Sequence, residues 1–380
     1  MTKAHRIAVV GRGLIGCAAA RHLSRMGHEV ALIGPDEPRD YARHDGVFGS
    51  HYDEGRITRV IEAHPFWRKA NAAAISRYGE IAAQSGVDFY REVGVLHMGP
   101  GATSDVASIG EIATEAGIAC ETYADAALAE RFPFLTSTLG MLGYFEPRNA
   151  GYISPRRLVQ AQTIAAQRTG ARIVDDAALG LTETGSGVTI RTRSTTVQAE
   201  RVLVAAGGHT QALLGQSLGF EVYGRTVAMF RLNAAQAERL AAMPSMRCFG
   251  PKGQDPYILP PIRYPDGQLW LKLGGDPTDL VLDSEADIQR WFRSGGSIQV
   301  ADGLQAQILD RIRDLHFEER RVVPCMATFS DSGVPRIGAV SPRVAVALGC
   351  YGKSAKCSDE LGRLGAMALL GEGSSEQIDL

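Results

Sequence analysis

The sequence predicts an α/β protein with two domains, one of which is split along the chain. A glycine-rich motif joins an apolar strand to a helix near the first residues, a unit typical of nucleotide-binding proteins. Further apolar strands that end in glycines lie far downstream, in VLVAAGGHT at 202–210 and VAVALG at 344–349. The 380 residues also exceed the roughly 150 residues of an average domain.

The composition is ordinary for a globular protein, with 45% hydrophobic and 22% charged residues. Forty Lys and Arg against 42 Asp and Glu leave a net charge of -2, so we expect no nucleic-acid partner and no attraction to an anionic membrane. No apolar run approaches the roughly 20 residues that span a bilayer, and the first residues do not follow the signal-peptide pattern. We expect a monomeric protein of the cytoplasm.

The six cysteines form neither a CxxC motif nor the Cys/His spacings typical of zinc sites. We therefore expect free thiols in a reducing compartment and no metal site. The cysteines are Cys17, Cys120, Cys248, Cys325, Cys350 and Cys357.

The first nucleotide-binding signal is the motif GRGLIG, which follows the predicted strand RIAVV at 6–10. Gly11 permits a tight turn, Gly13 lets a pyrophosphate approach the backbone, and Gly16 lets the helix pack on the sheet. The free N–H groups and the positive dipole end of that helix favour phosphate. We assign to this loop Gly11, Gly13, Leu14, Ile15 and Gly16.

An acidic residue that binds the ribose usually ends the second strand of such a unit, which here is EVALI. That position holds Gly34. Asp36 and Glu37 follow closely, and either reaches the ribose if the loop bends back. We assign Asp36 to this role.

The glycines that end the strand at 202–210, including Gly207, let a ligand lie close to the backbone. The predicted fold is a discontinuous Rossmann-type domain with an inserted mixed α+β domain. The expected residues are 1–88, 150–218 and 322–380 for the nucleotide-binding domain, and 89–149 and 219–321 for the inserted substrate domain.

Four motifs occur in one order over nearly the whole chain: GRGLIG, GSHYDEGRITR, the pair LWLKLGG and PCMATFS, and GCYGKSAKCSDELG. In this the chain resembles the D-amino-acid-oxidase superfamily of flavoproteins, and within it the group of monomeric sarcosine oxidase and N-methyltryptophan oxidase. The resemblance implies FAD as cofactor. It also implies oxidation of the C–N bond of a secondary, imino or amino acid by hydride transfer to the flavin, which O2 reoxidises to give H2O2.

Arginine suits a substrate carboxylate, because two parallel N–H bonds fix orientation as well as charge. The resemblance implies that Arg59 and Lys356 bind the carboxylate and that Arg56 lies near the flavin ring. Orientation supplies most of the catalysis, since the amine carbon must face the flavin N5. Lys353 adds a cation at the start of the last helix, whose N-terminus would stabilise negative charge on the flavin. The alternative for these side chains is solvation in loops.

Two further residues gain roles from the resemblance. Lys272 lies on a predicted strand and would face the flavin and promote its reaction with oxygen; the alternative is a lysine on a surface face. Cys325 would bind the flavin ring covalently; the alternative is a small core residue. The remaining residues assigned to the cofactor site are Ser50, His51, Gly207 and Gly352.

The resemblance fails at two pocket positions. Asp276 stands where the family has a histidine, and Ala327 stands where it has a tyrosine. Tyr257 is a candidate replacement for the lost aromatic wall. We therefore expect a substrate larger than sarcosine, with a second cationic group as one option if Asp276 points inward.

Four alternatives to an oxidase stay open. A dehydrogenase of the same superfamily would pass electrons to a quinone or a protein. An NAD-dependent dehydrogenase would be colourless. A flavin-binding module that acts on RNA-borne substrates has the same fold, although the balanced charge argues against it. A catalytically inert flavin-binding protein would result if Asp276 or Ala327 had spoiled the site.

Overall fold

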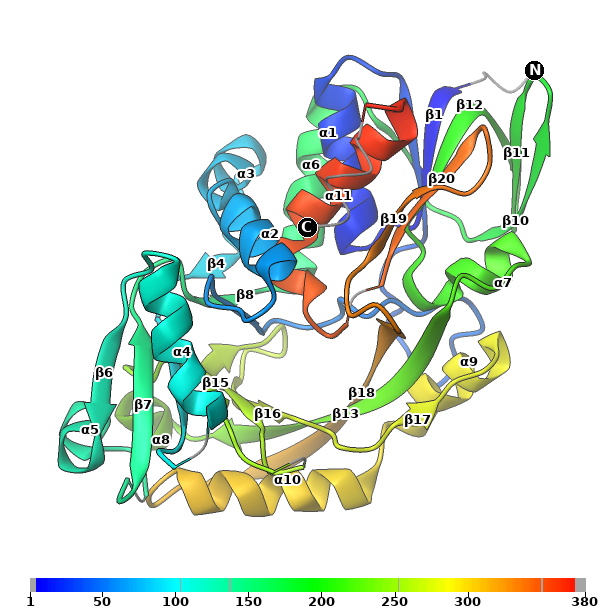
Figure 1. The fold of residues 1–380 in the computed structure, drawn as a ribbon. Coiled ribbons are helices and arrows are strands. Elements are labelled where there is room, and N and C mark those ends of the chain that lie inside the picture. The colour runs from blue at the N-terminus through cyan, green and yellow to red at the C-terminus, as the bar shows by residue number, and fades with distance from the viewer. Residues whose placement is uncertain (1–4, 103, 137, 252, 350, 373–380) are drawn as a thin grey trace.

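The computed structural model describes residues 5–102, 104–136, 138–251, 253–349 and 351–372 (Figure 1). Strands of these residues form three sheets, of eight, nine and three strands. In Figure 1 the eight-stranded sheet occupies the upper half of the molecule and the nine-stranded sheet the lower half. The predicted mixed α/β class is confirmed.

The eight-stranded sheet has a parallel centre in the order β9-β2-β1-β12-β20, flanked by antiparallel partners. Its strands are β1 (His5–Val10), β2 (Val30–Ile33), β9 (Arg172–Val174), β10 (Ala178–Thr184), β11 (Gly187–Thr192), β12 (Thr196–Val204), β19 (Arg336–Ala339) and β20 (Val344–Leu348). Three helices lie side by side on one face: α1 (Leu14–Arg25), α6 (Pro155–Arg168) and α11 (Ser354–Leu370) (Figure 1).

Small residues allow these helices to approach the sheet and each other closely. A Cβ atom on Gly16 would lie 1.8 Å from the Gly11 carbonyl oxygen, so only glycine fits there. A Cβ atom on Gly362 of α11 would lie 2.6 Å from the Ala19 amide nitrogen and 2.7 Å from the Ile15 carbonyl oxygen of α1. The strand, glycine turn and helix predicted at the start of the chain are thus present, and α11 is the predicted last helix.

A buried carboxylate also fixes α11. Asp359 accepts hydrogen bonds from Arg21 of α1 at 2.8 Å and from Gln162 of α6 at 2.9 Å, and it pairs with Arg77. Both Asp359 and Arg21 have 0% exposed surface. Removing one partner of such a buried pair leaves an uncompensated charge, so the register of α11 against its neighbours is strongly specified.

The nine-stranded sheet is long and curved, with the order β17-β13-β16-β15-β14-β5-β7-β6 and β18 paired to β13. Its strands are β5 (Val95–Pro100), β6 (Glu121–Ala124), β7 (Met141–Glu146), β13 (Phe220–Leu232), β14 (Ser245–Cys248), β15 (Tyr257–Arg263), β16 (Leu269–Gly274), β17 (Leu280–Val281) and β18 (Glu319–Ser330). Helices around it are α4 (Ser104–Glu115), α5 (Asp125–Arg131), α8 (Ala234–Arg239) and α10 (Ile298–Arg311). In Figure 1, α10 runs beneath this sheet and α4 stands beside β7.

A three-stranded sheet lies between these two halves and carries one of the predicted arginines. It contains β3 (Arg56–Thr58), β4 (Tyr90–Arg91) and β8 (Gly151–Ile153). The remaining helices are α2 (Pro65–Ile75), α3 (Tyr78–Ser85), α7 (Thr210–Leu214) and α9 (Glu285–Ser294), with a 3-10 turn at Gly207–His209.

The two large sheets differ from the expected division of the chain in one stretch. We assigned 322–380 to the nucleotide-binding domain, but β18 belongs to the nine-stranded sheet. Its antiparallel register with β13 is unbroken from Glu319 opposite Arg231 to Ser330 opposite Phe220. Because that ladder holds both strands together, residues 322–330 lie with the predicted substrate domain.

Two further findings concern membrane-spanning helices and cysteines. No helix of the described residues is long and apolar enough to cross a bilayer. Among the described cysteines, all are free thiols, namely Cys17, Cys120, Cys248, Cys325 and Cys357. Cys350 lies outside the described residues.

The contact between α1 and α11 predicts a local cost of adding a methyl group. We expect Gly362→Ala to lower the free energy of unfolding by about 1–3 kcal/mol, because the new Cβ overlaps the α1 backbone. Urea unfolding measures this change. The matched control is Gly303→Ala in α10, where nothing lies within 4 Å and stability should be unchanged or higher. Equal stability of the two variants would contradict the close approach.

Candidate active site

A cavity of about 400 Å³ opens at the carboxyl ends of the parallel strands. Seven residues assigned to the cofactor line it: Gly11, Gly13, Leu14, Ile15, Ser50, His51 and Gly207. The other assigned cofactor residues do not, namely Gly16, Asp36, Arg56, Cys325, Gly352, Lys353 and Lys356. Of these, Gly16 instead packs α1 against the turn.

The glycine turn leaves room and hydrogen-bond donors for an anion. Gly11 has φ +111°, and a Cβ atom there would lie 2.3 Å from the Ala205 carbonyl oxygen. Gly13 is the N-cap of α1 and has no side-chain cap, so the first N–H groups of the helix face the cavity. A Cβ atom on Gly13 would meet only His51 Nδ1, at 3.8 Å. Burial lowers the pKa of His51 to about 4, so this imidazole is neutral.

The expected ribose acid is engaged elsewhere. Asp36 pairs with Arg12 at 2.9 Å, and its side chain is 70% exposed. Glu37 accepts two bonds from Arg156, at 2.6 and 2.8 Å. Close backbone packing explains why position 34, at the end of β2, does not hold the usual acidic residue. A Cβ atom on Gly34 would lie 2.6 Å from the Arg12 amide nitrogen. The ribose contact of Asp36 stays a prediction.

Several residues around the cavity carried no signal in the sequence. His209 joins Glu285 at 2.6 Å through Nδ1 and the Phe48 carbonyl oxygen at 2.8 Å through Nε2. Phe48 stacks on Phe292 of α9 at 4.6 Å. Met326 of β18 completes this wall. These contacts bring the strand at 202–210, the loop at 45–52 and α9 together, which no single motif indicates.

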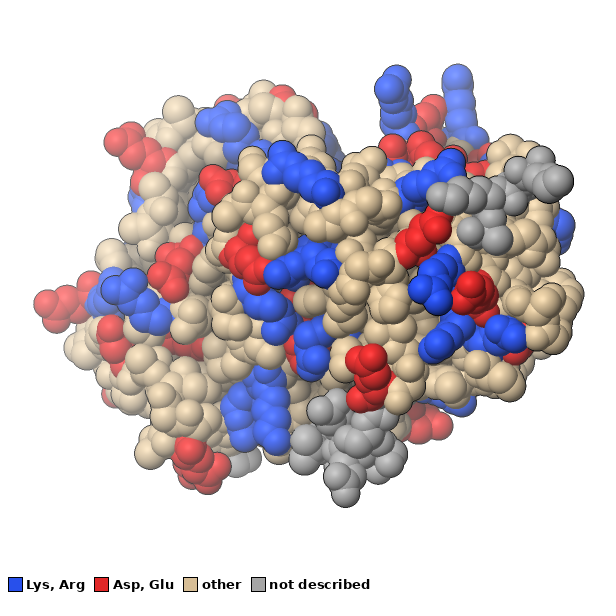
Figure 2. Space-filling view, turned by 90° about the horizontal axis from the view of Figure 1, so that it is seen from above, with Lys and Arg blue, Asp and Glu red and all other residues tan. Residues whose placement is uncertain are grey.

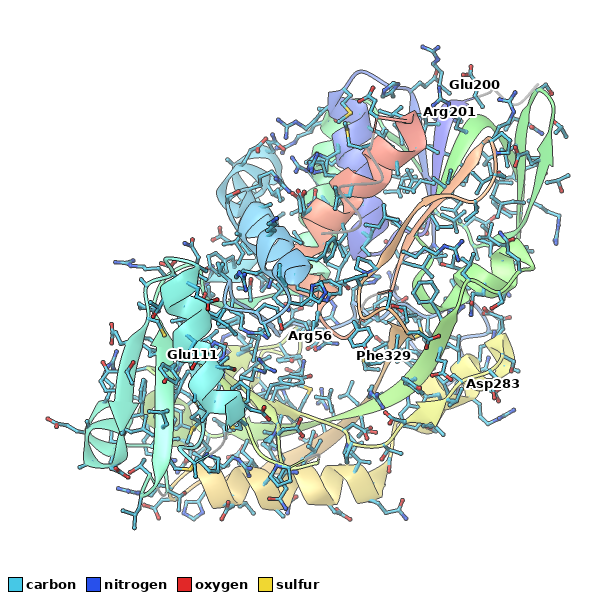
Figure 3. The ribbon with its side chains drawn as sticks, in the orientation of Figure 1. Arg56, Glu111, Glu200, Arg201, Asp283 and Phe329 are labelled. Carbon is cyan, nitrogen blue, oxygen red and sulfur yellow. The ribbon has the colours of Figure 1, made fainter. Side chains whose placement is uncertain are left out.

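Asp53 organises the cations between the two large sheets. Its carboxylate contacts Lys272 of β16 and Arg56 of β3, and it accepts a hydrogen bond from the Tyr264 hydroxyl at 2.7 Å. The Lys272 ammonium also donates to the Gly55 carbonyl oxygen at 2.7 Å. Figure 3 shows Arg56 at the centre of the molecule, between the upper helices and the lower strands. The structure thus brings Arg56 and Lys272 together, as the sequence suggested, through an aspartate that the sequence did not single out.

The setting of Lys272 alters its chemistry. The side chain is 1% exposed and its ammonium lies 5.5 Å from the centre of the Tyr257 ring. Burial, and then the charge of Arg56, lower the pKa of Lys272 to about 7. Tyr257 is therefore placed beside a functional candidate, on the neighbouring strand β15.

Cys325 lies beside Arg56 and not in the main cavity. Its Sγ is 3.3 Å from Arg56 Nη2, and the residue lines a smaller cavity that shares Gly49, Ser50 and Tyr52 with the main one. Met326 lines the main cavity because successive strand residues point to opposite faces. Covalent attachment of flavin through Cys325 stays a prediction.

A second group of cations surrounds Glu62. The Glu62 carboxylate accepts from Arg59 at 2.8 Å and from Lys353 at 3.1 Å. Lys356, 4% exposed at the start of α11, donates to the Lys353 carbonyl oxygen at 2.9 Å. Burial, and then Arg59, lower the pKa of Lys356 to about 7. Gly352 is exposed in the turn before α11, with φ +63°. Arg59 and Lys356 are thus close neighbours.

The two departures from the family pattern lie near the edge of the nine-stranded sheet. Both Asp276 oxygens accept backbone N–H groups, from Thr226 at 2.7 Å and Thr278 at 2.8 Å. Ala327 lies opposite Tyr223 in the ladder of β13 and β18. Because the Asp276 carboxylate accepts hydrogen bonds from the backbone, the structure gives no support to an acidic pocket wall at this position.

Metal chemistry has no candidate in the described part of the chain. No three His, Cys, Asp or Glu side chains among the described residues are grouped so that they could hold an ion.

The glycine turn predicts a variant that loses the cofactor but keeps the fold. We expect Gly13→Ala to lower bound FAD at least tenfold, a cost of about 1.4 kcal/mol, because the methyl group projects into the cavity and meets no protein atom closer than 3.8 Å. Equilibrium titration of the apoprotein with FAD measures the affinity. The apoprotein should keep its unfolding temperature. Gly79→Ala, in open space in α3, is the control; normal FAD binding by Gly13→Ala would contradict the assignment.

Comparisons with known proteins find relatives in sequence and in fold. The chain is 27% identical to the N-methyl-L-tryptophan oxidase of Yersinia pestis (strain Pestoides F) over 212 residues, which are 54% of each chain. The chain therefore spans about half the length of the curated relatives it matches.

Solved structures with the same fold cover nearly the whole chain. NikD, described as an unusual amino acid oxidase essential for nikkomycin biosynthesis, superposes with a TM-score of 0.80 at 18% identity over 99% of this chain and 97% of that one. Glycine oxidase from Bacillus cereus gives 0.76 at 17% identity over 99% and 97%. The family model described as FAD dependent oxidoreductase matches residues 6–367. The chain belongs to the FAD dependent oxidoreductase family.

Proposed function

We propose that this protein oxidises the C–N bond of a small amine that carries a carboxylate, with FAD as electron acceptor and O2 as final oxidant. The observation that carries this proposal is the pair of buried cations Arg59, directly after β3, and Lys356, at the start of α11. Arg59 bonds to Glu62, and the charge of Glu62 also acts on Lys356. Such a pair suits an anionic ligand. The named activities of the relatives, on an N-methyl amino acid and on glycine, support an amine of this kind.

The residues around the main cavity fit FAD. The uncapped N-terminus of α1 and the turn at Gly11 and Gly13 would hold the pyrophosphate. We propose that the half of the molecule with the eight-stranded sheet is the discontinuous FAD-binding domain, and that the nine-stranded sheet is the substrate domain. When bound, FAD supplies the acceptor for the hydride of the carbon next to nitrogen.

The chain's own residues would hold and orient the substrate. Arg59 offers a planar fork to a carboxylate, and Glu62 fixes the direction of that fork at 2.8 Å. Lys356 adds a second cation from the α11 terminus. Holding the carboxylate at two points fixes the amine relative to the cofactor, and this alignment is a large part of catalysis.

A dehydrogenase that passes electrons to another acceptor is the second candidate, and one contact favours it. Asp53 pairs with Lys272, the residue proposed to promote reaction with oxygen. The carboxylate offsets the positive charge that would stabilise a reduced oxygen anion. The rate at which air reoxidises the reduced flavin distinguishes the two candidates.

An NAD-dependent dehydrogenase and an enzyme of RNA-borne substrates receive less support. The family is described as FAD dependent, so NAD is not the cofactor expected for this chain. On the face shown in Figure 2, acidic and basic side chains are interspersed, which does not favour an RNA-borne substrate. An inert flavin-binding protein, a monomeric state and a place in the cytoplasm remain predictions to be tested.

The carboxylate requirement is the sharpest test of the proposed function. Under anaerobic conditions, N-methyl, cyclic imino, D- and L-amino acids would be mixed with the holoprotein, each beside its carboxamide. We expect one class of acids to bleach the flavin, and its amides to fail. Arg59→Met should lower the affinity for that acid roughly 10- to 100-fold, because a charge-assisted hydrogen bond contributes about 1.5–3 kcal/mol to binding. Admitting air should then yield peroxide.

Equal reduction by acids and amides would refute the carboxylate clamp. If no amine bleaches the flavin while dithionite does, an inert flavin-binding protein gains support and the catalytic assignment fails. Arg239→Met, on the exposed face of α8, is the matched control for the loss of an arginine.

The depressed pKa of Lys356 predicts a pH dependence of carboxylate binding. Lys356 is charged below pH 7 and neutral above it, so affinity should fall as pH rises, by about tenfold between about pH 6 and pH 8. Burial raises the pKa of Glu146 to about 7, and its ionisation acts in the same direction. Calorimetric titration with propionate measures the affinity.

The variants separate these two groups. Lys356→Arg keeps its positive charge over this pH range, so it should reduce the pH dependence of propionate affinity. Glu146→Gln, combined with it, should remove the pH dependence that is left. A profile that neither variant changes would show that different groups control binding.

A further inference from the structure

Arg247 on β14 is a cation without a partner among the described residues. Its guanidinium lies 4.5 Å from the centre of the Phe249 ring, and within the described part of the chain no hydrogen bond or ion pair reaches it. Burial, and then the charge of Arg59, lower the pKa of Arg247 to about 10, so it still carries its charge at neutral pH. Arg247 is half-buried, and a half-buried guanidinium with no acid bonded to it is suited to an anionic ligand.

The groups around Arg247 are also unsatisfied within the described residues. His97 lies opposite Arg247 in the parallel ladder of β5 and β14. Its Nε2 is 3.6 Å from the Glu146 carboxylate, and neither ring nitrogen has a hydrogen bond within the described residues. The Ser245 hydroxyl, on the same face of β14, and Arg59 Nε are likewise buried and unsatisfied. Burial and the two arginines hold the pKa of His97 well below its usual value, so it is a neutral donor or acceptor. Unsatisfied polar atoms of this kind are rare in a protein core, and several of them gathered beside a guanidinium favour a binding site.

The charges near Arg247 do not balance. The cations are Arg59, Lys353, Lys356 and Arg247 itself, whereas Glu62 is shared by Arg59 and Lys353. Glu146 is occupied by the backbone N–H groups of Val60 and Ile61.

Three acids act on Arg247 only at a distance. Glu62, and after it Asp255 and Asp105, raise its pKa through their charge, but within the described residues none of them forms an ion pair with it. A single substrate carboxylate on Arg59 and Lys356 would therefore leave Arg247 uncompensated.

We propose that Arg247 binds a second anionic group of the substrate, so that the substrate is an amino or imino acid with an acidic side chain. The inference rests on the proposed function, since Arg59 and Lys356 take the first carboxylate. It reverses the option of a second cationic group, because Asp276 is bound to the backbone and the unpaired charge is positive. His97 and Ser245 would supply neutral hydrogen bonds to the same group.

Binding of non-oxidisable acids tests this assignment without turnover. Calorimetry of the holoprotein would compare succinate, glutarate and adipate with their monoamides, and would add 3-phosphonopropionate. We expect at least one diacid to bind ten times or more tighter than its monoamide, because the amide leaves Arg247 unpaired. Tighter binding of 3-phosphonopropionate alone would also support the site. It would show that the second anionic group is a phosphonate and not a carboxylate.

Variants locate the effect. Arg247→Met should abolish the preference for the diacid and change the affinity of the monoamide by less than threefold. Arg247→Lys should keep part of the preference. Arg239→Met, which removes an exposed arginine of α8, should behave as the unchanged protein. Unfolding temperatures of all variants report whether the fold is kept.

The outcomes separate the two proposals. If monoamides bind and Arg59→Met abolishes that binding, but no diacid or phosphonate binds tighter, the role of Arg247 is overturned and the proposed function stands. If no carboxylate of either kind binds, the carboxylate site itself fails. A diacid preference that survives in Arg247→Met would also overturn the inference.

Discussion

The need to compensate charges removed from water organises this protein. Asp359 joins three helices through Arg21, Gln162 and Arg77, with its carboxylate fully buried. Asp53 joins the loop before β3 to β16 through Lys272. Breaking either cluster would leave a buried charge without a partner, which costs far more than a surface pair. The packing of α11 against its neighbours therefore depends on Asp359, and the placement of β16 beside the loop before β3 depends on Asp53.

The same constraint identifies where ligands belong. Two of the places in the described residues where donors are left unsatisfied are the uncapped start of α1 and the face of β14 near Arg247. The first accepts phosphate through backbone N–H groups and the helix dipole. The second offers a guanidinium to an anion. Where the protein supplies its own acid, as Asp53 does for Lys272, a side chain is oriented before any ligand arrives.

The candidate site was predictable to the extent that it resides in local motifs. The glycine turn and the cations of GSHYDEGRITR and GKSAKCSDELG are contiguous in sequence, and the structure places Arg59 beside Lys356 and Arg56 beside Lys272. The ribose contact assigned to Asp36 gains no support from the structure. Arg12 occupies the space beside Gly34, and its guanidinium pairs with the Asp36 carboxylate. The expected pocket wall at Asp276 gains no support, because backbone hydrogen bonds to a carboxylate cannot be read from a motif.

Local sequence was sufficient to predict the strand, turn and helix of the nucleotide site, since backbone geometry requires glycine at Gly11 and Gly16. The order of the apolar segments was likewise sufficient for the mixed α/β class. Which side chains meet depends instead on packing in three dimensions. Asp53 with Lys272, and Arg247 with His97, are far apart in the chain, and strand pairing, not local preference, brings them together. The same pairing places β18 with the nine-stranded sheet.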